Sequence, residues 1–523
     1  MNIVSEAWKS AHDELLLPET FIKLRFGVTE PGLALAASTV ATNEESFSEA
    51  EKITNALDKE PEKYATLEHN IWGLDGTFNY FDETPIDAGY TTSVFSEDNG
   101  IFLQRAMVVF APTITIQFPS VRTTLIPGIT ITWGNAFDEY ATSFVITVYN
   151  GSTVVFQETV TDNTSPVSQI FTALQDYDKI VIKVLEWCLP HRRCRVTEVF
   201  LGIRETYTKS ALLSYDHTES ADLLSASLPK SEIVFSLDNS TGRWNPSNPT
   251  GFEQYLIERQ EVAIKYGMDV NGVTEWIDGG VLWLSEWNTP ANGIEATFTA
   301  RDSLTFANDI YTGIKKGTLY DIAVAAFEQM ELPPLLDGSS RFFIDESLKN
   351  QTTDFSAEET EYTIADVLQM VAHMGCCVLR QNRHGQVRVE PHNETVTDYV
   401  INRFRSYAHP EVSFSKPLKA VEVTYGDNQK TTLNVASTGE VQTVANEFIK
   451  TDADAQKVAA RTANVLKGRQ TISGEFRVDP RLCALDVVTI ENKYADNEVA
   501  ITEIKYTTTG GAFKGTYTGR IVR

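Results

Sequence analysis

The sequence predicts a mainly β protein with smaller α+β portions. Between residues 228 and 304, apolar residues such as Ile233, Phe235 and Leu237 recur at every second position, which is the period of half-buried strands. Turn-forming steps such as Asn245-Pro246 separate these runs. Similar short runs fill residues 100–205 and the end of the chain. We therefore expect two β-barrels, an inserted jelly-roll-like β-sandwich and one small α+β domain.

A chain of 523 residues is too long for a single hydrophobic core and divides into several domains. The predicted segments are 1–95 (a helix, a strand and an arm that join the first barrel), 96–205 (the inserted sandwich), 206–308 (the first barrel), 309–410 (the α+β domain) and 411–523 (the second barrel).

The N-terminal segment is predicted to begin with a helix over residues 3–17, which Pro18 ends. The alternating run "TFIKLRFGVT" follows as a strand. Residues 38–63 are acidic and polar without a period, which indicates a loop or arm. In the sandwich, Asn150-Gly151 predicts a hairpin, because both residues tolerate the positive φ of a type I′ turn.

Residues 309–410 change to helical spacing. The runs "TLYDIAVAAFEQM" and "TIADVLQMVAHMGCC" each place their apolar residues on one helix face, with Thr363 as N-cap and Gly375 as the stop of the second helix. A hairpin then turns at His384-Gly385. After residue 411, strands such as "KAVEVTYG", "TTLNVAS" and "GEVQTVAN", with one helix in "DADAQKVAARTANVLKG", are predicted to form the second barrel.

Charge and hydropathy exclude several classes of partner. The net charge of −27 argues against a specific grip on nucleic acid or an anionic membrane, since both need clustered Lys and Arg. No run of eighteen apolar residues is present, so we expect no membrane span. The N-terminus has acidic residues where a signal peptide needs basic ones, so we expect synthesis in the cytoplasm.

The five cysteines do not predict a metal or redox site. Cys188 and Cys194 flank His191 in "WCLPHRRC", but a closed zinc site needs a fourth ligand, and none is spaced nearby. Cys376 and Cys377 are adjacent and lack the spacer of a redox motif. We expect small buried thiols and no metal or cofactor.

No catalytic motif is present in the sequence, so we predict no catalytic residues and no enzyme. The step Arg301-Asp302, at the end of a strand, has two interpretations. Asp302 is either a catalytic carboxylate or the N-cap of a following helix beside an ion pair; we favour the cap, because Asp is a preferred N-cap residue.

The sandwich offers one candidate binding site. Tyr140 lies in a predicted loop and could stack on a sugar ring, with Asp138 and Glu139 as acceptors for sugar hydroxyls and Trp133 as a further aromatic surface. Alternatively, Trp133 and Trp187 are core residues, since large aromatics dominate sandwich cores; we favour this second interpretation for both tryptophans.

The order of these blocks resembles that of tail-tip hub proteins of siphophages and prophages, which are similar in fold to the baseplate hubs of contractile tails. The motifs that carry the resemblance are spread over nearly the whole chain: "YATLEHNIWGLDGTF", "SLPKSEIVFSLDNSTGRWNPSNPTGFEQYLIERQEVAIKYG", "ATFTARDSL", "TIADVLQMVAHMGCCVLRQNRHGQV" and "FRVDPRLCALDVVTI".

The resemblance implies a structural hub in the virion, built from two hub-type barrels per chain and three chains per ring. A homotrimer would match a hexameric tail tube, with the distal tail protein, the end of the tape-measure protein and receptor-binding proteins or fibres as partners. Many relatives continue into a host-binding or wall-degrading domain. This sequence ends at Arg523, soon after the predicted second barrel, so we expect neither activity from such a domain here.

Two other function classes compete with the hub. One is an adhesin that binds host-surface glycan through residues 96–205. The other is an enzyme that degrades the cell wall, which the absence of a catalytic motif disfavours.

Overall fold

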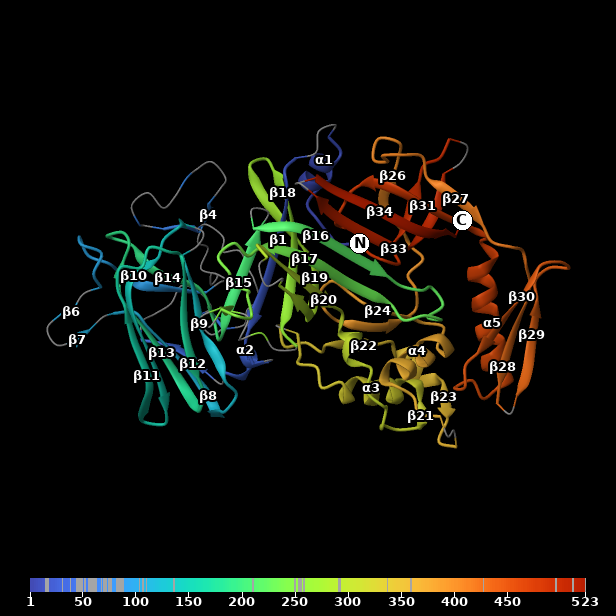
Figure 1. Cartoon of the computed structure of the whole chain (residues 1–523), viewed down its shortest axis with the longest axis horizontal. Helices are drawn as coiled ribbons and strands as arrows, with labels where there is room; N and C mark the ends of the chain where they lie inside the picture. Colours follow the sequence, from blue (N-terminus) through green and yellow to red (C-terminus); the bar gives the residue numbers. More distant parts are fainter. Residues whose placement is uncertain are drawn as a thin grey trace. The chain divides into compact units, whose positions relative to one another are not determined.

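The computed structural model of the chain is mainly β, with small α+β portions, as predicted (Figure 1). It describes the chain except for the residues in the following list: 15–17, 31, 38, 44–49, 51–52, 55–63, 67, 69–72, 74–77, 81–88, 103, 106–107, 110, 135–136, 209–210, 249–250, 253–255, 257–258, 290–292, 336, 358–359, 427, 494–495, 510–511 and 523. Much of the predicted arm at 38–63 therefore lies outside the described residues.

The chain forms two compact units. Unit 1 comprises Met1–Arg25, Thr206–Leu335 and Ser340–Arg523, and unit 2 comprises Phe26–Glu205 with Leu336–Ser339. Strands β1 (Thr20–Val28) and β15 (Ile203–Thr208) each extend across a boundary between the units. The five domain boundaries expected from the sequence stay predictions.

Unit 2 contains two antiparallel sheets. The first has the order β11-β10-β13-β8-β2 and the second the order β12-β9-β14-β5. Their strands are β2 (Thr39–Thr42), β5 (Tyr90–Phe95), β8 (Thr113–Arg122), β9 (Ile126–Trp133), β10 (Ala141–Asn150), β11 (Thr153–Val160), β12 (Val167–Leu174), β13 (Tyr177–Trp187) and β14 (Arg193–Phe200). Inward-facing side chains of both sheets, such as Ile131 and Ile146, share one buried cluster, which makes this a sandwich.

Two local predictions for this unit need correction. β2 lies within the predicted loop 38–63, because Val40 pairs with Ile116 and extends the first sheet. The hairpin near Asn150 is present, but Asn150 pairs with Thr153, so the turn residues are Gly151 and Ser152. Gly151 has a φ of 59°. The turn therefore lies one residue later than predicted.

Short elements complete unit 2. They are α2 (Leu33–Ala36), the pair β3 (Tyr64–Ala65) and β4 (Asn79–Tyr80), and the pair β6 (Gln104–Arg105) and β7 (Val108–Val109).

Unit 1 is organised around a thirteen-stranded sheet, whose main path runs β15-β1-β18-β19-β20-β17-β16-β33-β34-β31-β27, with β32 and β26 branching from β33. Its further strands are β16 (Leu212–Ser220), β17 (Lys230–Asp238), β18 (Glu261–Val270), β19 (Val273–Asn288), β20 (Glu295–Arg301), β26 (Val396–Ile401), β27 (Glu411–Phe414), β31 (Gln470–Arg477), β32 (Val487–Ile490), β33 (Asn497–Thr509) and β34 (Ala512–Ile521).

The strands assigned to two barrels share this one sheet. β16 pairs with β17 on one side, where His217 lies opposite Ile233, and with β33 on the other, where His217 lies opposite Tyr506. Because β16 uses both of its edges in this way, the described pairings do not close two separate barrels; the path ends at β15 and β27.

A smaller sheet of unit 1 has the order β29-β28-β30 and is covered by helix α5 (Asp452–Lys467). Its strands are β28 (Leu418–Tyr425), β29 (Gln429–Asn434) and β30 (Glu440–Ala445). These strands were predicted to belong to the second barrel. They form a separate layer because Val421 and Val423 are buried in the same cluster as Val458 of α5.

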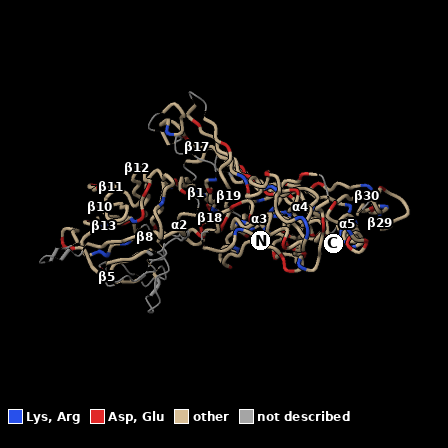
Figure 2. Tube along the Cα trace, turned by 90° about the horizontal axis from the view of Figure 1, so that it is seen from below, with Lys and Arg blue, Asp and Glu red and all other residues tan. Residues whose placement is uncertain are grey.

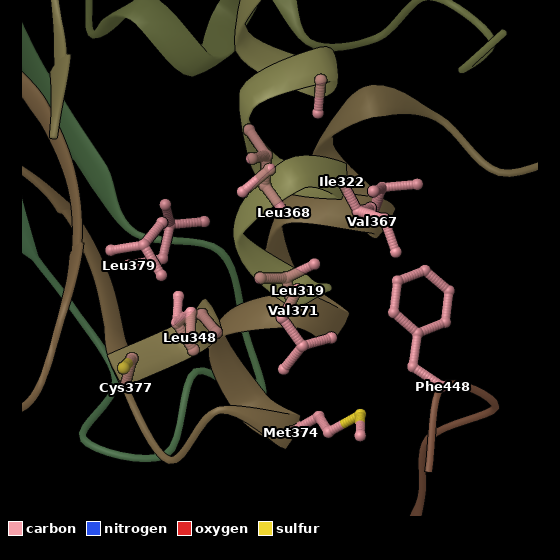
Figure 3. Packing of buried hydrophobic residues seen from close by; sticks show 14 of the residues in the cluster. Leu319, Ile322, Leu348, Val367, Leu368, Val371, Met374, Cys377, Leu379 and Phe448 are labelled. Atoms are coloured by element: carbon pink, nitrogen blue, oxygen red, sulfur yellow. The ribbon is translucent and has the colours of Figure 1, made fainter. Parts of the chain in front are cut away.

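The predicted α+β portion is present in unit 1 and has a continuous apolar core (Figure 3). Its elements are β21 (Lys316–Thr318), α3 (Leu319–Gln329), β22 (Phe342–Ile344), η5 (Glu346–Asn350), β23 (Thr352–Asp354), α4 (Ile364–Met374), β24 (Val378–Gln381) and β25 (Val387–Glu390). Thr363 caps α4 through a capping box with Asp366, and Gly375 is its C-cap, as predicted. The hairpin at His384-Gly385 is also confirmed.

The N-terminal helix α1 (Glu6–His12) is shorter than the predicted 3–17. Ser5 caps it, and Trp8 and His12 are buried. The His12 ring Nε2 lies 2.9 Å from the carbonyl of Val478. α1 thus contacts the segment that follows β31, far away in the sequence.

Candidate functional site

A buried polar cluster of unit 1 lies on β16. This strand joins two strand groups, which we define as β17–β20 on one side and β31, β33 and β34 on the other. Tyr215, His217 and Glu219 alternate along this strand, so all three side chains project from one face. We call them, together with Tyr266 of β18, Tyr506 of β33 and Arg383 of the β24–β25 turn, the β16 network.

Three rings form the first part of the β16 network. The hydroxyl of Tyr266 lies 2.6 Å from His217 Nδ1 and 2.6 Å from the hydroxyl of Tyr215. Burial lowers the pKa of His217 to about 4, although nearby Glu219 opposes this shift. The His217 ring is therefore neutral near pH 7.

An ion pair forms the second part. Arg383 Nε donates to Glu219 Oε1 at 2.8 Å, and its two terminal nitrogens donate to the carbonyls of Pro480 and Leu482. Burial alone would raise the pKa of Glu219, but Arg383, together with His217 and the backbone N–H of Ala484, holds that pKa below its ordinary value. Tyr506 also donates to the Leu482 carbonyl, at 2.8 Å. The network thus ties four separate segments of the chain together.

A cavity of about 200 Å³ lies beside the network. Glu219 and Arg383 line it, with Asp302 and Lys230 among the other lining residues. The carboxylates of Glu219 and Asp302 both accept hydrogen bonds from protein donors. These two groups therefore have hydrogen-bond partners without a ligand in the cavity.

Asp302 caps a helix and Arg301 forms ion pairs, which is the interpretation that we favoured for these two residues. Asp302 is the N-cap of the short 3₁₀ helix η4 (Ser303–Phe306), and its carboxylate accepts from the backbone N–H groups of Leu304 and Ser231. Arg301 forms ion pairs with Glu232 at 2.9 Å and Glu286 at 2.8 Å. Burial raises the pKa of Asp302 to about 6, because its two backbone donors only partly compensate for lost water.

The four proposed glycan-binding residues do not form one open platform. Trp133 is 0% exposed and donates its indole N–H to Ser168 at 2.8 Å, so it is a core residue. Glu139 is 3% exposed and accepts from the indole of Trp187 at 2.9 Å. Asp138 is exposed, with a φ of 55°, and Tyr140 is half-buried against the sandwich core. Glycan binding stays a prediction, and of its four proposed residues only Asp138 and Tyr140 are not buried.

Glu139 belongs instead to a buried ionic cluster of unit 2. We call Glu68, Glu139, Arg192 and Arg195 the sandwich cluster. Arg195 donates from both terminal nitrogens to Glu68, and its Nη1 lies 3.7 Å from Glu139. Arg192 Nε lies 3.2 Å from Glu139.

The pKa values of the two carboxylates of the sandwich cluster are shifted in opposite directions. Burial alone would raise the pKa of Glu68, but the hydrogen bonds and charge of Arg195, together with hydrogen bonds from Thr66 and the Arg193 backbone, lower that pKa below its ordinary value. Burial raises the pKa of Glu139, and the Trp187 indole and the two arginines only partly offset it. The guanidinium therefore stabilises charge on Glu68 in preference to Glu139.

The cysteine motif does not assemble a zinc site. Cys194 is fully buried, whereas His191 is exposed and lies 2.9 Å from Asp98. The Cys188 sulfur accepts from the backbone N–H of Tyr140 at 3.3 Å. Cys377 is buried in the α+β core, and Cys376 is half-buried against that core. Within the described residues, no group of three or more His, Cys, Asp or Glu is placed to hold a metal ion.

Sequence reasoning did not find the β16 network or Glu68. A usable signal was present in "SYDHTES", where Tyr215, His217 and Glu219 take alternate positions that apolar residues would occupy in an ordinary strand. Glu68 carried no such signal, since its arginine partner lies 127 positions away in the sequence.

Asp and Glu are spread along the described chain and interspersed with Lys and Arg (Figure 2). Among the helices that the structure describes, none has the length and apolar character to cross a membrane.

Comparison with known proteins identifies remote structural likeness only. No protein-family model matches the sequence, and no curated protein matches it. Among solved structures, the 43 kDa tail protein of prophage MuSo2 from Shewanella oneidensis is 13% identical with a TM-score of 0.43, over 60% of this chain and 94% of that one. The tail protein from Neisseria meningitidis MC58 is 10% identical with a TM-score of 0.44, over 60% of this chain and 93% of that one.

A chain of the phage P2 baseplate is also similar. It is 9% identical with a TM-score of 0.26, over 65% of this chain and 93% of the baseplate chain. A likeness at these identities and scores does not by itself identify a function.

Proposed function

We propose that this chain is a structural component of a phage tail tip or baseplate and that it resides in the virion. This is the class of role that the names of the solved structures above give to those proteins. The observation that carries the proposal is the thirteen-stranded sheet, in which two strand groups far apart in the sequence are joined through β16. In the β16 network, the polar groups mainly bond one another and the backbone, which supports a structural and not an enzymatic role.

The finer form of the proposal is a homotrimeric hub ring. Each chain would contribute two strand groups, so three chains would present six of them in register with a hexameric tail tube. The ring would contact the distal tail protein, the end of the tape-measure protein and receptor-binding proteins or fibres. Three chains of net charge −27 around a conduit would repel DNA and let it slide.

Copy number in purified particles tests this role. Quantitative mass spectrometry of particles, calibrated against a tail protein of known copy number, should give three copies of this chain per particle. Absence of the chain from particles would overturn the tail role, whereas one or six copies would overturn the trimer alone.

The non-enzymatic role has its own test. Purified chain incubated with host cell walls should release no soluble saccharide or peptide fragments. Fragment release that exceeds a heat-inactivated control would contradict it.

A further inference from the structure

The strand at one end of the large sheet is β27, and no strand among the residues that the structure describes pairs with its outer edge. β27 pairs with β31 on one side, with Val412 opposite Ile472 and Phe414 opposite Gln470, and the sheet path ends there (Figure 1). The backbone N–H of Ser415 donates to the carbonyl of Arg469 at 2.8 Å. Ser415 therefore bonds toward β31, and every second residue along β27 does the same. By that alternation, the N–H and C=O groups of Val412 and Phe414 point away from β31.

The same two residues leave apolar surface uncovered. Val412 is 37% exposed and Phe414 is 64% exposed. Both project to the face on which Ile472 and Phe476 of β31 are fully buried. The core face of the sheet therefore continues past its last strand, where one more strand bearing apolar side chains would cover it.

The segment that contains β27 holds more cationic than anionic residues, and two of its cations, Arg405 and Lys416, form ion pairs with Asp13 and Glu440. Residues 403–419 hold four Lys or Arg and one Glu, in a chain of net charge −27. Arg403, Lys467 and Arg469 are exposed and form no ion pair with any residue that the structure describes. Arg469 lies beside Ser415, and its side chain projects to the face opposite Phe414.

We propose that β27 accepts an extended, acidic segment of a separate partner protein as an additional antiparallel or parallel strand. The segment would place apolar side chains on the face of Val412 and Phe414 and carboxylates on the face of Arg469. Pro410 has the same parity as Val412 and Phe414 and lacks an N–H group, so the added ladder is limited at that end of β27. This inference does not depend on the tail role.

The binding test uses a fluorescein-labelled heptapeptide that alternates Glu and Val, with anisotropy measured on the full chain at low salt. The peptide should bind, and an analogue with Lys in place of Glu should bind at least tenfold more weakly. Arg469→Glu should weaken binding of the acidic peptide severalfold and strengthen binding of the basic analogue. Equal binding of both peptides, or no binding of the acidic one, would overturn the proposal.

Two proline variants locate the site. Val412→Pro removes an outward N–H without touching the bonds to β31, and should weaken binding at least tenfold. Val154→Pro is the matched control: Val154 lies on the edge strand β11 next to the hairpin pair Asn150–Thr153, is 47% exposed and also directs its N–H outward. It should bind the peptide as the unchanged chain does.

Circular dichroism and thermal unfolding establish that both variants fold. The proposal would be wrong if the folded Val412→Pro variant bound the acidic peptide as tightly as the unchanged chain does. It would also be wrong if both proline variants lost the same amount of peptide affinity. Analytical ultracentrifugation tests whether a second copy of the chain occupies the edge instead. If the chain self-associates without peptide and Val412→Pro abolishes this association, the edge binds a second copy, and the proposal of a separate partner protein is wrong.

Discussion

The β16 network of unit 1 and the sandwich cluster of unit 2 bury charge in two different ways. In the β16 network, one arginine faces one carboxylate, and backbone carbonyls take its remaining donors. In the sandwich cluster, two carboxylates lie near Arg195, and the pKa of one is lowered while that of the other is raised. The pKa is thus lowered at Glu68, which accepts hydrogen bonds from both terminal nitrogens of Arg195, and raised at Glu139, where the arginines only partly offset burial.

The largest expected effect is at Arg383. Arg383→Met would leave Glu219 buried without its cation and would remove the arginine donors to the carbonyls of Pro480 and Leu482, of which Leu482 keeps its bond from Tyr506. We therefore expect the free energy of unfolding to fall by about 3–5 kcal/mol. Urea titration followed by far-UV circular dichroism measures this change. Arg380→Met is the control, since Arg380 pairs with Glu390 at a partly exposed site, and should cost less than about 1 kcal/mol. Similar losses for the two variants would contradict the assigned role of burial.

The pH dependence of stability tests the neutral His217. Its unfolded pKa is near 6.5 and its folded pKa is about 4, so the folded state binds fewer protons between these values. Stability should therefore fall as the pH falls through this window, by up to about 3 kcal/mol, and level off below pH 4. His217→Gln should lack this contribution, which a difference curve of the two proteins reveals.

The difference curve also removes other titrations. Asp302, whose pKa burial raises to about 6, gives the opposite slope in both proteins and cancels. A His217→Gln curve parallel to that of the unchanged chain would mean that His217 is not held neutral by folding.

In the sandwich cluster, the two carboxylates should respond unequally to neutralisation. Glu68→Gln removes the anion that Arg195 contacts from both terminal nitrogens, and should cost about 2–3 kcal/mol. Glu139→Gln replaces a group whose pKa is already raised, and should cost less than about 1 kcal/mol. Thermal unfolding with hydrogen exchange at β13 and β14 measures both. Equal costs would remove the distinction between the two sites.

The smallest effect is expected at an exposed ion pair. Arg301→Ala removes contacts with Glu232 and Glu286 from a side chain that is 37% exposed, and should cost less than about 1 kcal/mol. Asp302→Ala, at the neighbouring cap, should cost about 1–2 kcal/mol in the same urea titration. A larger loss at Arg301 than at Asp302 would reverse our interpretation of this step.

The sequence predicts elements better than it predicts how they assemble. Period-two runs gave strands β17, β18 and β20, and the caps Thr363 and Gly375 gave the ends of α4, because both signals are local. The pairing of β16 with β33 joins residues nearly 300 positions apart, and no local pattern encodes it. The same limit explains why the strands β28–β30 were assigned to the wrong sheet.

The candidate site followed the same division. The cap role of Asp302 was predictable, because an N-cap depends on its immediate neighbours. Glu139 was placed in an open loop, although folding buries it beside Arg192, Arg195 and the Trp187 indole. The sequence allowed Trp133 to be either a glycan-stacking surface or a core residue, and its complete burial shows that it is a core residue.

Electron cryo-microscopy of the intact particle that encodes this chain tests the central claim most directly. We predict density at the tail tip or baseplate that fits the thirteen-stranded sheet, with β16 joining its two strand groups. Complete particles whose tail density is fully accounted for by other proteins would contradict a structural role for this chain.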